Sequence, residues 1–132
     1  MLTKVFRTKI LCTVVLWALP LSLFPASWFV RMGMPEPRPL LFFRLLGAAY
    51  SALVVEYGLG LRRLSQGAAA RDTIWVGVAS NGSASLILLL CGVAGRWKGW
   101  GKWARMYMWG SAIVTASIAL GLVVTGLLRD NR

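Results

Sequence analysis

Two ionisable residues, Arg44 and Glu56, lie inside one long apolar segment, residues 39–61. A run of about 20 apolar residues is long enough to cross a bilayer as a helix, and a charge inside it costs roughly 2.5–3.5 kcal/mol on insertion scales. Each of the two side chains therefore needs a bonding partner or a chemical role. On one helix they would lie about 120° and about 18 Å apart, so they cannot pair with each other.

Glu56 is the residue on which a functional interpretation depends most. An antiparallel helix over residues 74–95 would bring Asn81 to nearly the same depth, with Tyr57 and Ser80 nearby. A carboxyl group there could handle protons or contact a quinol, or it could hold helices or a partner subunit together. We favour the structural role, because proton paths usually contain more than one intramembrane carboxyl group.

Arg44 lies five residues from the expected start of its helix. That position is close enough for the long side chain to extend to the lipid headgroups at the membrane surface. We prefer this interpretation, and the alternative is that Arg44 binds an anionic headgroup or a carboxylate of a partner protein.

The composition is that of an integral membrane protein. Of 132 residues, 58% are hydrophobic and 14% are charged, whereas a soluble domain carries about 25% charged residues. The net charge of +11 comes from basic residues that cluster at the ends of the apolar runs. There they would meet the phosphates of anionic phospholipids, so we expect lipid contacts and no nucleic acid.

The chain contains no histidine and two cysteines, Cys12 and Cys91. Histidine is the usual axial ligand of haem and the commonest ligand of zinc, and two cysteines cannot form a structural metal site. We therefore expect no metal, no cofactor and no catalytic residue, and we do not interpret the chain as an enzyme.

The apolar runs predict an all-α membrane protein, a four-transmembrane-helix bundle formed by a single domain over residues 1–132. Pro20 is expected to kink the first helix, and a proline-rich connector follows it. The expected helices cover about residues 10–30, 39–61, 74–95 and 106–128.

Residues 96–105 alternate basic and aromatic side chains. Beside a membrane span this pattern indicates a belt at the lipid headgroups rather than a site for single-stranded nucleic acid. The residues that we assign to this lipid interface are Trp97, Lys98, Trp100, Lys102, Trp103 and Arg105.

Small residues recur along the last expected helix at helical spacing, which predicts a helix-packing face. The members of this stripe are Gly110, Ser117, Gly121 and Thr125. Leu122 lies about 100° away from the stripe, and we expect it to face lipid or a looser contact. The first half of helix 74–95 is also small and polar, so we expect it to face protein.

Four spans place both termini on one side of the membrane, and the charge count favours the cytoplasm. The inner set would be Lys4, Arg7, Lys9, Arg62, Arg63, Arg71, Arg129 and Arg132. The smaller outer set would be Arg31, Arg38, Arg96, Lys98, Lys102 and Arg105.

Two segments, PEPRPLLFFRLLGAAYSALVVEYG and IWVGVASNGSAS, resemble small four-helix bacterial membrane proteins of the DoxX-like kind. In such proteins a proline-bearing loop leads into a second helix with an FxRLxGA-type pattern. The resemblance implies a four-helix bundle in a bacterial inner membrane and, in some members, association with quinone-linked oxidoreductases. It transfers no catalytic residue to this chain.

We therefore expect a non-catalytic accessory or structural subunit of a larger membrane complex, which packs against partner helices and phospholipids. The alternative from another class is a small proton-coupled transporter centred on Glu56, with Asn81 and Arg44. A quinone-associated redox subunit is the third hypothesis, and it comes from the resemblance.

Overall fold

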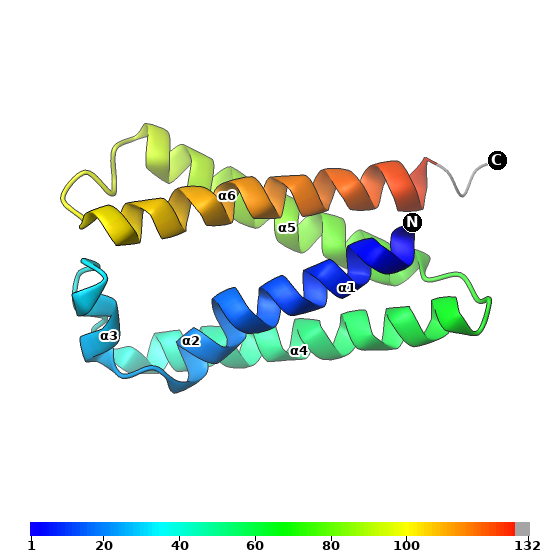
Figure 1. Ribbon diagram of the computed structural model, residues 1–132, viewed down its shortest axis with the longest axis horizontal. Coiled ribbons are helices and arrows are strands. Elements are labelled where there is room, and N and C mark those ends of the chain that lie inside the picture. The colour runs from blue at the N-terminus through cyan, green and yellow to red at the C-terminus, as the bar shows by residue number, and fades with distance from the viewer. Residues whose placement is uncertain (129–132) are drawn as a thin grey trace.

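The computed structural model describes residues 1–128, which form helices and no strand. Four of these helical segments are long and apolar enough to cross a membrane, and they lie side by side (Figure 1). The predicted all-α four-helix bundle is confirmed. Arg129 and Arg132, which the charge count includes, lie outside the described residues.

The first span begins and ends earlier than the sequence predicted. It consists of α1 (Leu2–Thr13), a π-helical turn η1 (Val14–Ala18) and α2 (Leu19–Leu23). It ends because Phe24, which precedes a proline, is extended with ψ of 137°.

Pro20 stays inside the helix because another helix replaces the hydrogen bond that it removes. A proline has no amide hydrogen, so the carbonyl four residues earlier, that of Leu16, loses its usual donor. The Tyr107 hydroxyl donates a hydrogen bond to that carbonyl. This is how proline is commonly tolerated in membrane helices.

A short helix outside the four spans, α3 (Ala26–Arg31), follows the first span. The second and third spans are α4 (Leu40–Ser65) and α5 (Arg71–Val93). The fourth consists of α6 (Lys102–Leu122) and the π-helical turn η2 (Val123–Leu127). The loop after α3 packs directly on the start of α6, where the Gly101 amide donates to the Gly33 carbonyl over 2.8 Å. Gly33 has φ of +86°, a conformation that suits glycine.

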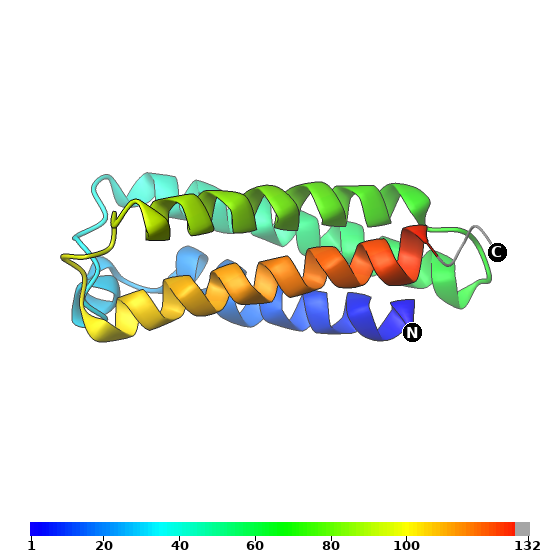
Figure 2. The same cartoon turned by 90° about the horizontal axis from the view of Figure 1, so that it is seen from above.

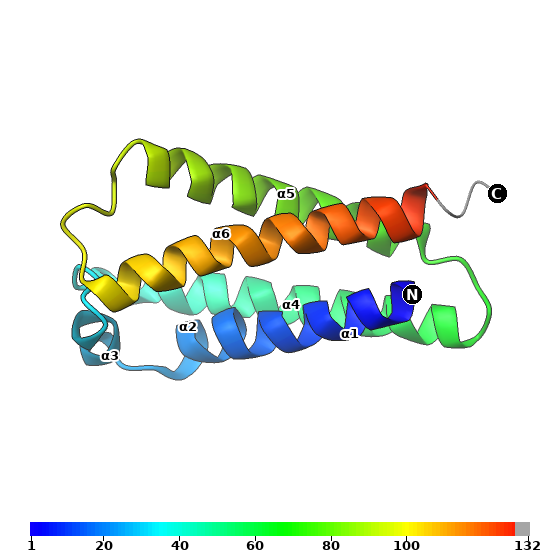
Figure 3. The same ribbon diagram turned by 45° about the horizontal axis from the view of Figure 1, so that its top comes forward.

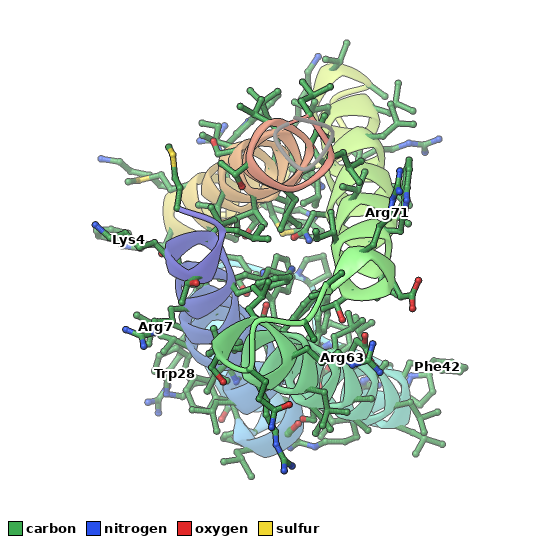
Figure 4. The ribbon with its side chains drawn as sticks, turned by 90° about the vertical axis from the view of Figure 1, so that its right-hand side faces the viewer. Lys4, Arg7, Trp28, Phe42, Arg63 and Arg71 are labelled. Atoms are coloured by element: carbon green, nitrogen blue, oxygen red, sulfur yellow. The ribbon has the colours of Figure 1, made fainter. Side chains whose placement is uncertain are left out.

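The long helices run alternately up and down. The first span lies beside α4, and α5 lies beside α6 (Figure 3). The start of α1 and the end of η2 lie at the same end of the bundle (Figures 1 and 2). Viewed onto that end, Lys4 and Arg7 point away from the bundle (Figure 4). The start of the chain and the end of η2 at one end of the bundle agree with four crossings.

The hydrophobic core is concentrated at this same end. Its buried members are Phe6, Tyr57, Ala70, Ile74, Ile118 and Leu122. Leu122 is 0% exposed, and its side chain packs so close to Gly77 that a Cβ there would lie 2.5 Å from Leu122 Cδ1. The expectation that Leu122 faces lipid is therefore wrong, because the small residue that admits it is on α5 rather than on α6.

The predicted small-residue stripe of α6 is not the face that packs within the chain. Gly110 and Ser117 are exposed, and a Cβ at Gly121 would touch only Val5, at 3.7 Å. The Thr125 hydroxyl donates to the Gly121 carbonyl of its own turn. The buried face of α6 is made instead by Ala104, Ser111, Ala112, Thr115, Ile118 and Leu122.

Candidate functional site

Lys9 lies in the interior of the bundle, although the sequence placed it in the basic segment before the first span. The prediction was wrong because α1 begins at Leu2 and includes Lys9, which is 5% exposed. Its ammonium group donates a hydrogen bond to Asn81 Oδ1 over 2.5 Å. The same nitrogen lies 5.2 Å from the centroid of the Tyr57 ring, within cation–π range.

The depth of the ammonium group is unusual for a lysine. Lys9 is only about 10 Å along α1 from Leu2, so its side chain could extend back to the headgroups. Its partner Asn81 is about 15 Å along α5 from Arg71, near the middle of that span. The charge is therefore directed into the bundle rather than toward the membrane surface.

Asn81 is held in one orientation by its own helix. Its amide nitrogen donates to the Gly77 carbonyl over 2.6 Å, which leaves the amide oxygen directed at Lys9. Asn81 is 1% exposed. The expectation that Asn81 meets Glu56 is wrong, since its oxygen is occupied by Lys9.

Glu56 and Tyr57 both bond to α5, but at different places. Glu56 Oε1 accepts a hydrogen bond from the Thr73 hydroxyl over 2.8 Å, and the Tyr57 and Ser80 hydroxyls lie 2.8 Å apart. The two neighbours on α4 point about 100° apart, so they cannot share a partner. The proton-transport hypothesis therefore loses the Glu56–Asn81 contact on which it was built.

Arg44 does not extend to the headgroups. Its Nη1 donates to the Leu21 carbonyl over 2.9 Å and its Nη2 to the Phe24 carbonyl over 2.8 Å. A helix end leaves its last carbonyl groups without helical donors. Arg44 supplies donors where the first span ends, so its role in the chain is to close that helix end.

A cavity of about 490 Å³ opens beside Lys9 and Asn81. Its lining includes residues of α4 and α5, two helices that diverge from each other toward the end of the bundle opposite the N-terminus (Figures 1 and 3). Tyr50 of α4 and Trp17 of the first span also line it, and their rings stack at a centroid distance of 5.5 Å. The cavity therefore combines a buried cation, an amide and hydroxyl groups with apolar walls.

The predicted belt of aromatic and basic residues, within residues 96–105, contains both buried and exposed members in the structure. Trp97 is 5% exposed and packs edge-on against Trp109 at 5.4 Å, so its assignment to the lipid interface is wrong. Trp100 is half-buried against Trp97. The members that lie exposed on the surface are Lys98, Lys102, Trp103 and Arg105.

Sequence reasoning missed Lys9, and a signal for it was present. The buried residues of α1 are Phe6, Lys9 and Thr13. Their spacing of three and four residues places them on one helix face. Extending the first helix by about two turns, to Leu2, would have shown that Lys9 continues an inward face.

Comparison of the chain with protein-family models, with curated proteins and with solved structures found no match. The resemblance to DoxX-like proteins therefore stays a prediction.

Proposed function

We propose that the chain is a non-catalytic accessory subunit of a larger membrane protein complex. The observation that supports this most is the use of its polar intramembrane side chains as bonds between its own helices. These bonds are Lys9 to Asn81, Thr73 to Glu56, Tyr57 with Ser80, and Arg44 to the end of α2. Polar contacts of this kind hold helices together in lipid, where apolar burial gives little drive for association.

A face on α6 offers a place for a partner helix. Gly110 and Ser117 lie seven residues apart on one side of the helix and are exposed. A Cβ added at Gly110 would meet no atom within 4 Å. Small residues let a second helix backbone approach closely in a membrane, so we place the partner subunit on this face.

The exposed cations and the bundle ends provide the lipid contacts of the proposal. Lys98, Lys102 and Arg105 are exposed beside the start of α6 and suit anionic phospholipid headgroups. We place the chain in a bacterial inner membrane with both termini in the cytoplasm. A reporter enzyme that works only in the cytoplasm should then be active when it is fused after Arg132, and a reporter that works only after export should be inactive there.

The test is the size of the particle that contains the chain. Extracted from its native membrane in a mild detergent, the protein should co-migrate with a larger complex on a native gel. Gly110→Leu should shift it to a smaller particle, whereas Gly58→Leu on α4 should not. The two glycines form a matched pair, because a Cβ at either one meets no atom of the chain within 4 Å. Migration of the wild-type chain alone would contradict the proposal.

A further inference from the structure

The buried ammonium group of Lys9 has no counter-ion among residues 1–128. Within that range its hydrogen bond goes to Asn81, a neutral amide, and the ion pair that forms is between Arg38 and Glu36 in a loop. An ammonium group carries three donors. A charge inside a bilayer is costly unless it is paired or faces a polar cavity. Lys9 lines such a cavity, so the cavity is where a balancing anion fits.

Tyr50 supplies a second polar group to the same cavity. Its ring stacks on Trp17, but its hydroxyl has no hydrogen-bond partner within the part of the chain that the structure describes. Buried tyrosine hydroxyl groups usually find a partner. Tyr50 is half-buried. Its free hydroxyl and the Lys9 ammonium group are therefore two hydrogen-bond donors in one cavity, and both could donate to an oxygen atom of a ligand.

Most of the remaining lining of the cavity is apolar and comes from α4 and α5, and Met108 and Thr115 of α6 complete it. The apolar walls include Leu46, Leu53, Ile87 and Leu88, with the small side chains of Ala49 and Ala84 between them. Leu46 and Ile87 are themselves exposed on the outside of the bundle, so the cavity opens toward the surface that lipid would cover. Its volume of about 490 Å³ lies in the range of pockets that hold small ligands. A ligand would therefore enter from the lipid and carry an apolar chain.

We propose that this cavity binds a single-chain amphiphile with a carboxylate head, the chemistry of a long-chain fatty acid. The carboxylate accepts hydrogen bonds from Lys9 and Tyr50, and the hydrocarbon chain lies between α4 and α5. One carboxylate balances the one cation of the site. A phosphate head would bring a larger, more strongly hydrated group to the same depth, which costs more to bury.

The proposal is tested first by a change in the ligand alone. The purified protein in a neutral detergent is titrated with palmitic acid and with methyl palmitate, and the bound fraction is read by native mass spectrometry. The ester keeps the chain and loses the charge, so we expect it to bind at least about 10-fold more weakly. Equal binding of acid and ester would overturn the proposal, since the chain alone would then account for binding.

Variants locate the head of the ligand. Lys9→Met removes the charge at similar length, and we expect palmitate affinity to fall at least about 10-fold. Lys4→Met is the matched control, because Lys4 is exposed on the same helix, and it should leave affinity unchanged. Tyr50→Phe keeps the ring on Trp17 and removes the hydroxyl, and we expect a loss of about 3- to 10-fold. Unchanged affinity in both Lys9→Met and Tyr50→Phe would overturn the proposal.

A competition experiment separates a fatty acid from a phospholipid as the source of the anion. Lysophosphatidylglycerol has one chain and a phosphate head, and at equal concentration it should leave bound palmitate in place. If it displaces palmitate, the cavity selects the phosphate and the carboxylate assignment is wrong.

Discussion

The two halves of the α4–α5 pair differ in how the helices meet. Near the connecting loop, residues 66–70, the helices touch, and a Cβ at Gly60 would lie 2.5 Å from Thr73 Cγ2. The Tyr57 and Ser80 hydroxyls bond in the same half. Toward the other end of the bundle the two helices diverge (Figure 3). The cavity is lined there by residues of both helices, among them Leu46 and Tyr50 of α4 and Ala84 and Ile87 of α5.

The difference follows from which residues each half contains. The closed half has a glycine and hydroxyl groups at the contact, whereas the open half has Leu46, Leu53 and Ile87 on the cavity walls. Lipid tails solvate such aliphatic side chains as well as another helix does, so these residues give no strong drive to close the gap. Small and polar residues therefore decide where the helices meet in this bundle.

The largest effect should come from filling the contact in the closed half. Gly60→Leu should lower the free energy of unfolding by more than about 3 kcal/mol, because the larger side chain forces Thr73 and α5 away. Gly58→Leu, two positions along the same helix, should change it by less than about 0.5 kcal/mol, since Gly58 meets no atom within 4 Å. Helix content measured during unfolding in mixed detergents gives both values, and similar losses would show that the helices do not touch at Gly60.

The core that supports the closed half gives the next largest effect. Leu122→Ala should cost about 2–3 kcal/mol of unfolding free energy, because it leaves a hole against Gly77. Leu120→Ala removes the same atoms from a side chain that is 65% exposed, and it should cost under about 0.5 kcal/mol. If the two variants unfolded alike, Leu122 would face lipid as its sequence context suggested.

The hydrogen bond between Lys9 and Asn81, at the boundary between the two halves, should couple the effects of substitutions at these two residues on the free energy of unfolding. Asn81→Leu removes the acceptor of a buried ammonium group and should cost about 2 kcal/mol, and Lys9→Met should be similarly harmful. The double variant should be less harmful than the sum of the two, with a coupling energy of about 1–2 kcal/mol. Additive losses in this double-mutant cycle would show that Lys9 and Asn81 do not bond in the membrane.

The smallest effects are expected at Glu56, on the edge of the closed half. Glu56→Gln keeps an oxygen for the Thr73 hydroxyl and should cost less than about 0.5 kcal/mol. Glu56→Leu leaves that buried hydroxyl without an acceptor and should cost about 1 kcal/mol. Assembly into the native complex should follow the same order. A Gln variant that assembles normally but abolishes the activity of its membrane would favour proton transfer by Glu56 instead.

The number of spans could be predicted from the sequence because each is a long apolar run, a signal that depends on local composition alone. The ends of the first helix could not, because Lys9 looked like a flanking charge and Pro20 like the main interruption. The structure extends the helix through Lys9 and ends it at Leu23. The burial of Lys9 and the continuation through Pro20 depend on partners far along the chain, namely Asn81 and Tyr107. The end at Leu23 has a local cause, because Phe24 precedes a proline.

The candidate site was predicted in part. Asn81, Ser80, Tyr57 and Glu56 do form bonds between helices, as a polar residue in an apolar span must. Which of them pair could not be derived, because the pairs depend on how the helices are rotated and shifted along each other. For the same reason, the small-residue stripe did not identify the face of α6 that packs within the chain, since the glycine that admits Leu122 is on α5.

The burial of Lys9 is the central claim, and amine labelling tests it most directly. Opened membrane vesicles, with both surfaces accessible, are treated with a water-soluble acylating reagent, and the modified lysines are identified by peptide mass spectrometry. Lys4, exposed on the same helix, should be modified readily, and Lys9 should stay unmodified until the protein is unfolded in SDS. Modification of Lys9 at the rate of Lys4 in intact vesicles would contradict the buried Lys9–Asn81 bond and the ligand site built on it.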